Sequence, residues 1–289
     1  MPDPSFKPVP YPMPPFPRTT LPTPYLHIPL PHIPALGLYI HIPFCRSRCH
    51  FCAFYLQIYR EDRAQDYLTA LFREIQLHVE QGTLGDRRLD TVYFGGGTPT
   101  ALQPSALGEI LACIQASFGL QPDAEITVEA HPDTVTREGL SQLVNAGFNR
   151  ISFGVQSLDD DELARMGRSP LPDTTSTAVA SARDAGFTDL SLDLIFGLSG
   201  QTLESWQSTL AQAIALNPTH LSCYALTVED GTRLIVDIRR GECTHPEDAL
   251  QNIMEDEAAT QLTSAGFDRY EISNYSRPGY ACRYLRPVQ

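Results

Sequence analysis

The sequence predicts an α/β fold in which parallel strands alternate with helices and form a closed or partly closed barrel. After residue 36, short runs of β-branched and aromatic residues alternate with longer stretches of helical period, and six good strand–helix units follow one another. Three helical stretches end in the same Ala-Gly-Phe sequence, at 146–148, 185–187 and 265–267. Because glycine suits the left-handed position that ends a helix, this repeated join indicates parallel strands linked by crossover helices.

Each element is assigned from its own residue pattern. Strands are expected at 38–43, 91–95, 125–129, 150–155, 189–196, 220–226 and 269–273, where β-branched and aromatic residues cluster. Helices are expected at 62–80, 104–118, 136–146, 159–166, 172–185, 203–216 and 246–265, and several begin with a capping residue such as Thr136 or Thr202. In barrels of this kind the chemistry lies at the C-terminal ends of the strands.

The charge of the chain limits its partners. Its 289 residues carry 34 acidic and 21 basic side chains, a net charge of -13, which is the wrong sign for neutralising phosphates or lying on anionic lipid. We therefore expect no nucleic-acid partner. No apolar run approaches the ~18 residues of a membrane span, and the start lacks the cationic and apolar stretches of a secretory signal. We expect a cytoplasmic protein with no transmembrane segment.

Residues 1–35 are rich in proline. Thirteen of the 24 prolines fall between Pro2 and Pro34, where charged residues are almost absent. Proline fixes φ and lacks the backbone donor, so this tract is expected to be an extended, disordered leader. The alternative is a ligand for a groove that binds proline-rich segments, but no basic residue is placed to fix an orientation.

Three of the seven cysteines lie within eight residues, directly after the first expected strand. A loop that carries Cys45, Cys49 and Cys52, spaced four and then three apart, can donate to three irons of a cuboidal cluster and leave the fourth iron open. Zinc also takes thiolates, and His41 or His50 could supply a fourth ligand to it. The other cysteines are scattered, as is usual in a reduced compartment.

Polar and glycine residues mark the ends of later strands. Gly96 and Gly97 leave the backbone open to a ligand, and Thr98 adds a hydroxyl. Glu129 and Asp193 end apolar strands, where a buried charge without a partner is costly. We therefore favour a function for both carboxylates.

The Cys-x-x-x-Cys-x-x-Cys loop after the first strand of a barrel resembles the radical S-adenosylmethionine (radical SAM) superfamily. The resemblance implies a [4Fe–4S] cluster on Cys45, Cys49 and Cys52. It also implies that the amino and carboxylate groups of S-adenosyl-L-methionine chelate the fourth iron. An electron, delivered by a donor such as a flavodoxin or ferredoxin, then cleaves this cofactor to a 5′-deoxyadenosyl radical. A primary radical requires a dry pocket, which a barrel mouth provides.

Further motifs narrow the resemblance. The segments 39–45, 94–100, 129–132, 149–157, 167–168 and 192–198 are similar to the oxygen-independent coproporphyrinogen III oxidase group, and the resemblance covers about residues 36–282. The pattern of that group implies cofactor contacts from Tyr39, Phe51, Gly96, Gly97, Thr98, Glu129, Gln156, Arg168 and Asp193. Among these, Arg168 is suited to pairing with a carboxylate. From sequence context alone, Arg168 could equally be a surface residue at a helix end and Tyr39 a core aromatic residue.

One position indicates a branch of this group. The dehydrogenases carry another cysteine two residues after the third cluster cysteine, whereas Phe54 stands there in this chain. Phenylalanine here, together with 217–224 and 271–280, is typical of the HemW-type haem chaperone branch. The resemblance therefore implies a protein that binds haem as cargo and passes it to apo-haemoproteins. A coproporphyrinogen III oxidase of porphyrin biosynthesis is one alternative, and an inactive truncated barrel or zinc-binding structural protein is another.

The end of the sequence departs from the group. After Arg283, relatives continue with a His-Asn pair, an aromatic element and a further domain, whereas residues 283–289 form a short tail that does not resemble them. We therefore expect a partial (βα)6 TIM-like barrel at 36–282 without the C-terminal accessory domain.

Overall fold

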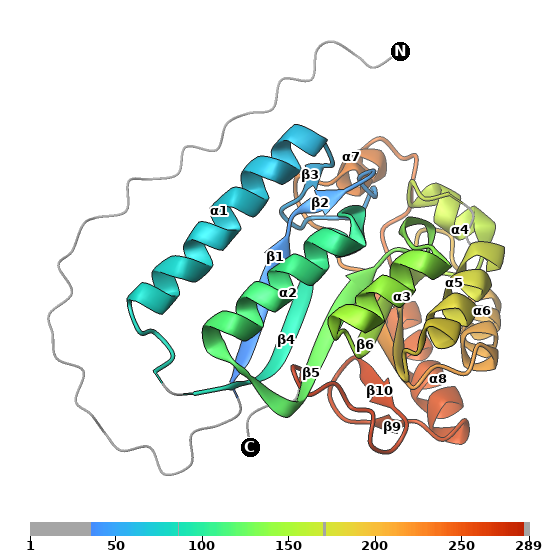
Figure 1. Ribbon diagram of the computed structural model, residues 1–289. Helices are drawn as coiled ribbons and strands as arrows, with labels where there is room; N and C mark the ends of the chain where they lie inside the picture. The colour runs from blue at the N-terminus through green and yellow to red at the C-terminus, as the bar shows by residue number, and fades with distance from the viewer. Residues whose placement is uncertain (1–35, 86, 170–171, 286–289) are drawn as a thin grey trace, which may run out of the picture. The chain divides into compact units, whose positions relative to one another are not determined.

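The computed structural model describes residues 36–85, 87–169 and 172–285, so the leader expected at 1–35 lies outside the described residues. An eight-stranded sheet forms the centre of the described chain, in the order β1-β4-β5-β6-β7-β8-β10-β9 (Figure 1). The parallel strands are β1 (Gly37–Ile42), β4 (Leu89–Gly96), β5 (Leu120–Ala130), β6 (Arg150–Gln156), β7 (Asp189–Phe196) and β8 (His220–Ala225). The α/β class with parallel strands and a partial barrel is thereby confirmed.

The helices follow the strands as the sequence predicts. They are α1 (Glu61–Glu80), α2 (Pro104–Phe118), α3 (Arg137–Ala146), α4 (Asp160–Arg165), α5 (Pro172–Ala185), α6 (Leu203–Ala215), α7 (Arg233–Arg239) and α8 (Asp248–Ser264). Single 3-10 turns lie at Pro99–Ala101 and Pro132–Thr134. Figure 1 shows α1, α2 and α3 side by side along the strands. Only α7 among these α-helices was missing from the expected set.

The Ala-Gly-Phe joins have the expected geometry. Gly147, Gly186 and Gly266 have φ values of 111°, 112° and 84°, in the region that favours glycine. The phenylalanines that follow them are buried in the core. Each join therefore ends a helix and at once anchors the start of the next segment by an aromatic side chain.

The expected strand at 269–273 is wrong. Two short strands, β9 (Asp268–Arg269) and β10 (Asn274–Ser276), form an antiparallel hairpin there, and β10 also pairs antiparallel with β8. Glu271 Oε1 accepts a hydrogen bond from the backbone N–H of Ser273 at 2.9 Å and so supports the turn. So short a connection cannot join parallel strands, which require a crossover of a dozen or more residues.

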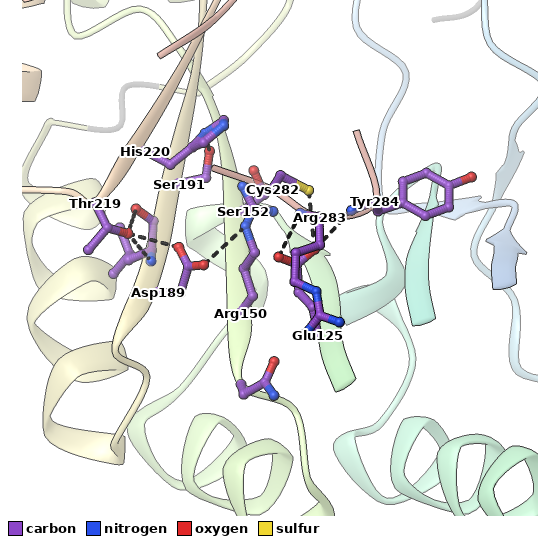
Figure 2. Close-up of polar contacts among 12 residues, drawn as sticks. Glu125, Arg150, Ser152, Asp189, Ser191, Thr219, His220, Cys282, Arg283 and Tyr284 are labelled. Atoms are coloured by element: carbon purple, nitrogen blue, oxygen red, sulfur yellow. Dashed lines mark hydrogen bonds and ion pairs between the residues drawn. The ribbon is translucent and has the colours of Figure 1, made fainter. Parts of the chain in front are cut away.

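The described end of the chain returns to β5, as Figure 2 shows. The Glu125 carboxylate accepts hydrogen bonds from the backbone N–H of Arg283 at 2.9 Å and that of Tyr284 at 3.3 Å. The Tyr284 ring lies 4.8 Å from the Tyr93 ring, between centroids. Residues 283–285 of the expected tail thus pack on the barrel strands, and 286–289 lie outside the described residues.

Within the described part of the chain, none of the helices combines the length and the apolar character needed to cross a bilayer.

Candidate cofactor-binding site

A cavity of about 880 Å³ opens at the C-terminal ends of the parallel strands. This volume lies within the range of pockets that hold small-molecule ligands and cofactors. Most of the predicted site residues line it: Cys45, Cys49, Phe51, Cys52, Gly96, Gly97, Thr98, Glu129, Gln156, Arg168 and Asp193. Strand topology explains this convergence, because parallel strands bring their C-terminal ends to the same edge of the sheet.

Tyr39 is the exception. Its ring is 41% exposed and stacks at 6.1 Å on Tyr93, the residue paired with it in the register of β1 and β4. Its hydroxyl lies 3.3 Å from His41 Nδ1. The structure therefore places Tyr39 beside β4 and not among the residues that line the cavity.

A pair of two-residue strands joins the start of the cysteine loop to its end. β2 (Phe44–Cys45) pairs in parallel with β3 (Gln57–Ile58). The backbone N–H of Gln57 donates to the Pro43 carbonyl at 2.6 Å, and that of Tyr59 donates to the Cys45 carbonyl at 2.8 Å. These bonds hold the loop against the barrel, so Cys45, Cys49 and Cys52 all face the same cavity. Such short strands leave no periodic signal in the sequence.

Glycines at the end of β4 allow the loop to approach closely. A Cβ atom at Gly97 would lie 2.7 Å from the Phe44 carbonyl oxygen and 3.0 Å from Cys45 Sγ. The backbone N–H groups of Gly97 and Thr98 donate to the Ile42 and Phe44 carbonyls at 2.8 and 2.7 Å. The glycine run thus serves the close packing of the cysteine loop on β4, in addition to leaving backbone open to a ligand.

Two thiols have neighbours that favour the thiolate. Burial raises the pKa of Cys45 and Cys49. Two neighbours offset part of this rise. The Thr98 hydroxyl, 3.5 Å from Cys45 Sγ, lowers the pKa of Cys45, and the Arg168 guanidinium, 3.9 Å from Cys49 Sγ, lowers that of Cys49. A metal that binds these sulfurs would complete the deprotonation, since the thiolate is the ligand.

Arg168 lies at the cavity and not on the surface. Its Nη2 donates to the Gly154 carbonyl at 2.6 Å, while its Nε is buried and has no hydrogen-bond partner among the described residues. Gly167, with a φ of 72°, packs against the His50 ring and directs the chain into the cavity. A buried guanidinium with an unused donor suits a carboxylate ligand or an anionic cluster.

The preceding helix is anchored by a buried carboxylate. Glu162, which is 1% exposed, accepts hydrogen bonds from Ser157 Oγ at 2.6 Å, Gln201 Nε2 at 3.0 Å and Ser205 Oγ at 2.6 Å. Since charged hydrogen bonds are the stronger kind, α4 and the Arg168 segment after it are held in place from three elements.

Two carboxylates face the cavity from neighbouring parts of the sheet. Glu129 accepts hydrogen bonds from the Tyr93 hydroxyl at 2.8 Å and from the Gly96 backbone at 3.2 Å. Asp193 accepts from Ser152 Oγ, at 3.0 Å from both of its oxygens. Burial raises the pKa of both carboxyls. Their polar partners Tyr93 and Ser152 were not predicted from the sequence.

Gln156 occupies a strained position. It ends β6 with a φ of 72°, and the register of β6 with β7 shifts between Gly154 and Gln156. A glutamine with positive φ is uncommon and costs conformational energy, and such residues cluster at functional sites. The bulge turns Gln156 toward the cavity, and the sequence carries no separate signal for it.

Arg150, which was not predicted from the sequence, lines the cavity although it stands at the start of β6. It is 1% exposed, and its Nε lies 3.5 Å from an Asp189 carboxylate oxygen. The available signal was an arginine inside an otherwise apolar strand, since a charge there must face a partner.

Comparison with known proteins explains this arrangement. The sequence matches the radical SAM superfamily over residues 39–213. The chain belongs to the radical SAM superfamily.

Its radical SAM relatives are longer proteins. The chain is 38% identical over 252 residues to heme chaperone HemW from Synechocystis sp., covering 85% of this chain and 60% of that one. It is 39% identical over 250 residues to heme chaperone HemW from Escherichia coli, covering 86% and 65%. Among solved structures, coproporphyrinogen III oxidase (HemN) from Escherichia coli matches with a TM-score of 0.76 and 30% identity, covering 85% and 56%. The chain therefore spans less than two thirds of the length of these relatives.

Radical SAM proteins in general hold a [4Fe–4S] cluster and S-adenosyl-L-methionine, and the residues present fit both groups. The three thiols share one cavity. Yet no group of three or more His, Cys, Asp or Glu side chains in the described ranges is gathered to hold one metal ion. Three thiols that face a common cavity suit a cluster, in which each thiolate binds its own iron. The unpaired Nε of Arg168 and the glycines of β4 complete the cradle.

The Glu129 carboxyl of this radical SAM cavity makes stability depend on pH. Burial, with the Asp193 charge adding to it, raises the pKa of Glu129 from 4.5 to about 7. Between these values the folded protein holds a proton that the unfolded chain has released. The free energy of unfolding therefore falls as pH rises from about 4.5 to about 7, by on the order of 3 kcal/mol.

Glu129→Gln isolates this effect, because glutamine can still accept the Tyr93 hydrogen bond but does not titrate. Urea unfolding at pH 5 and pH 8 is expected to show a smaller loss of stability in the variant than in the wild type. Asp193 is present in both proteins but is coupled to Glu129, so the difference between the two proteins measures the titration of Glu129 together with this coupling. An equal loss in the two proteins would contradict the assigned pKa.

Proposed function

We propose that this chain is the radical SAM portion of a haem chaperone, which binds haem and passes it to apo-haemoproteins in the cytoplasm. The observation that carries the proposal is the similarity to proteins named heme chaperone HemW, at 38 and 39% identity, against 30% to coproporphyrinogen III oxidase. Phe54 supports it, because this residue lies at the cavity mouth where the oxidase branch carries a cysteine.

The cavity residues have distinct roles in this proposal. Cys45, Cys49 and Cys52 supply the three thiolates of the cluster. When bound, the cluster supplies the electron that cleaves S-adenosyl-L-methionine. The following residues bind the cofactor: Phe51, Gly96, Gly97, Thr98, Glu129, Gln156, Arg168 and Asp193.

Charge and geometry assign these roles. Arg168 pairs with the cofactor carboxylate through its unused Nε donor, since this is the buried cation beside Cys49. Glu129 accepts hydrogen bonds from cofactor hydroxyl or amino groups, because it lines the cavity and its carboxylate is held in place by Tyr93 and Gly96. Tyr39 contacts the cofactor from beside the cavity in this proposal, since its ring stacks on Tyr93, which lines it.

Coproporphyrinogen III oxidase activity is the second candidate. The structural match to HemN supports it, with a TM-score of 0.76 over 85% of the chain. Both candidates require the same cluster and cofactor, and both take an electron from a donor such as a flavodoxin or ferredoxin. They differ in whether the porphyrin is carried or chemically changed.

Anaerobic reconstitution with iron and sulfide tests the shared part. The reduced protein is expected to show a [4Fe–4S]⁺ electron paramagnetic resonance that shifts when S-adenosyl-L-methionine is added. The Cys45→Ala, Cys49→Ala, Cys52→Ala triple variant is the control and should bind no cluster. A colourless protein that binds one zinc ion would overturn both candidates in favour of a structural barrel.

Haem titration separates the two candidates. We expect the reconstituted chain to retain haem and to transfer it to an apo-haemoprotein, with coproporphyrinogen III left unchanged. Decarboxylation of coproporphyrinogen III would instead establish the oxidase. Failure to retain haem, with an intact cluster, would refute the chaperone assignment.

A further inference from the structure

A chain of hydrogen bonds leads from the cavity to the edge of the sheet. Ser191 Oγ donates to Asp193 Oδ1 at 3.4 Å and lies 2.8 Å from His220 Nδ1. His220 Nε2 lies 2.8 Å from the Tyr270 hydroxyl. Figure 2 shows Ser191 and His220 facing each other from β7 and β8. The cofactor-binding roles given above use Asp193 alone among these four residues.

The middle of this chain of hydrogen bonds is buried, whereas its two ends are not enclosed in the same way. Ser191 and His220 are both 0% exposed, so neither exchanges protons directly with water. Asp193 lines the cavity at one end. At the other end Tyr270, in the turn between β9 and β10, is only half-buried. The polar groups therefore connect the cavity with the turn between β9 and β10.

The hydrogen bonds can all point in one direction. Burial and the charge of Arg150 lower the pKa of His220 well below its ordinary value, so the imidazole is neutral, with one donor and one acceptor nitrogen. Because Ser191 directs its proton to Asp193, its oxygen accepts from the Nδ1–H of His220. Nε2 then accepts from the Tyr270 hydroxyl, which in turn accepts a backbone hydrogen bond from Cys282.

Few charged groups act on this chain of hydrogen bonds. Arg150 influences Asp193, His220 and Tyr270. The other ionisable groups that face its two ends are Glu129, Tyr93, Cys223 and Tyr224 near Asp193, and Cys282 and Glu271 near Tyr270. The Arg150 charge disfavours a doubly protonated His220, so the imidazole stays neutral.

We propose that Tyr270, His220 and Ser191 form a proton path that connects Asp193 with solvent when a ligand fills the cavity. In one transfer Ser191 gives its proton to Asp193 Oδ1, His220 Nδ1–H gives its proton to Ser191, and Tyr270 gives its proton to His220 Nε2. Tyr270 regains a proton from water, so the chain ends neutral with its hydrogen bonds reversed. Proton release follows the reverse sequence.

Ligand binding changes the protonation of Asp193 and also closes the cavity through which Asp193 would exchange protons. A cationic sulfonium beside Asp193 favours the ionised carboxylate, whereas its departure favours the protonated form. Once the ligand blocks the cavity, water no longer reaches Asp193 from that side. This reasoning rests on the proposed binding of S-adenosyl-L-methionine only for what closes the cavity.

The tautomer of His220 tests the path without any ligand. Nitrogen-15 NMR of the histidine-labelled full chain is expected to show a neutral imidazole protonated at Nδ1 from about pH 5.5 to 8. Tyr270→Phe should leave that tautomer in place, because Ser191 still accepts from Nδ1. A doubly protonated ring in the wild type, or an Nε2–H tautomer that persists at the alkaline end of this range, would overturn the proposed direction of transfer.

The rate of Asp193 protonation tests the function of the path. After a pH jump, the infrared band of the Asp193 carboxyl, assigned by its absence in Asp193→Asn, is followed with and without saturating S-adenosylhomocysteine. With the ligand bound, Tyr270→Phe is expected to slow protonation by at least about tenfold. Without the ligand the open cavity should give equal rates. Tyr275→Phe, in the neighbouring strand β10, is the matched control and should behave as wild type in both states.

Equal rates for Tyr270→Phe and wild type with the ligand bound would overturn the path. Calorimetry of S-adenosylhomocysteine binding keeps this outcome apart from a failure of the proposed function. If the ligand does not bind, the cofactor assignment fails, and the tautomer measurement alone decides for or against the path.

Discussion

Arg150→Met is expected to lower the free energy of unfolding by about 3–5 kcal/mol, the largest effect of any substitution considered for this protein's stability. Arg150 is 1% exposed and lies between two carboxylates, with Asp189 at 3.5 Å and Glu125 on its other side (Figure 2). Methionine retains the apolar length of the side chain but removes the cation. The two carboxylates would then be buried without a compensating charge. Urea unfolding monitored by circular dichroism measures the loss.

An exposed ion pair provides the matched control. Arg137 lies 3.2 Å from Asp184, with side chains that are 72% and 55% exposed. Because solvent screens this pair, Arg137→Met is expected to cost less than about 1 kcal/mol. The loss in Arg150→Met should also shrink at acid pH, because burial raises the pKa of Asp189 and this carboxyl takes up a proton once the cation is gone. Similar losses in the two variants would show that Arg150 is not the counter-ion of the barrel interior.

The elements that the sequence predicts are those whose pattern is local. A helix such as α6 (Leu203–Ala215) carries its own capping residue, Thr202, which accepts from the Ser205 backbone at 3.1 Å. The strand pair β2 and β3 could not be predicted in this way, since each strand has two residues and exists only because of its partner. The hairpin at β9 and β10 was misjudged for a similar reason, because its strands have only two and three residues and exist through their pairing.

The same distinction applies to the candidate site. The cysteines, the glycines of β4 and the carboxylates of Glu129 and Asp193 could be predicted because each lies in or directly after a recognisable strand. Arg168 could not be placed from local pattern, since its contact with Cys49 joins residues 119 positions apart. Tyr93 and Arg150 face the barrel interior from inside strands, where sequence alternation alone does not distinguish inside from outside when both faces are covered.

Gly97→Ala is expected to weaken cluster binding by about 1–3 kcal/mol, roughly five- to 150-fold in the affinity of the loop for its cluster. The added methyl group would lie 2.7 Å from the Phe44 carbonyl oxygen and 3.0 Å from Cys45 Sγ. Neither atom is the end of a flexible side chain, so the strand or the cysteine loop must move. A displaced Cys45 no longer matches the positions of Cys49 and Cys52. Iron and sulfide content after anaerobic reconstitution and gel filtration measures the effect.

Gly108→Ala is the control for this substitution. Gly108 lies within α2, where a Cβ atom meets only the Ala146 methyl group at 3.2 Å, and alanine is favoured over glycine in a helix. This variant should keep full cluster content. Both variants should unfold cooperatively, because the cysteine loop contributes little to the core beneath it. Full iron content in Gly97→Ala, with the S-adenosyl-L-methionine shift intact, would mean that the loop can move away from β4 without losing its ligand geometry, and the close packing at Gly97 would then serve the strand alone.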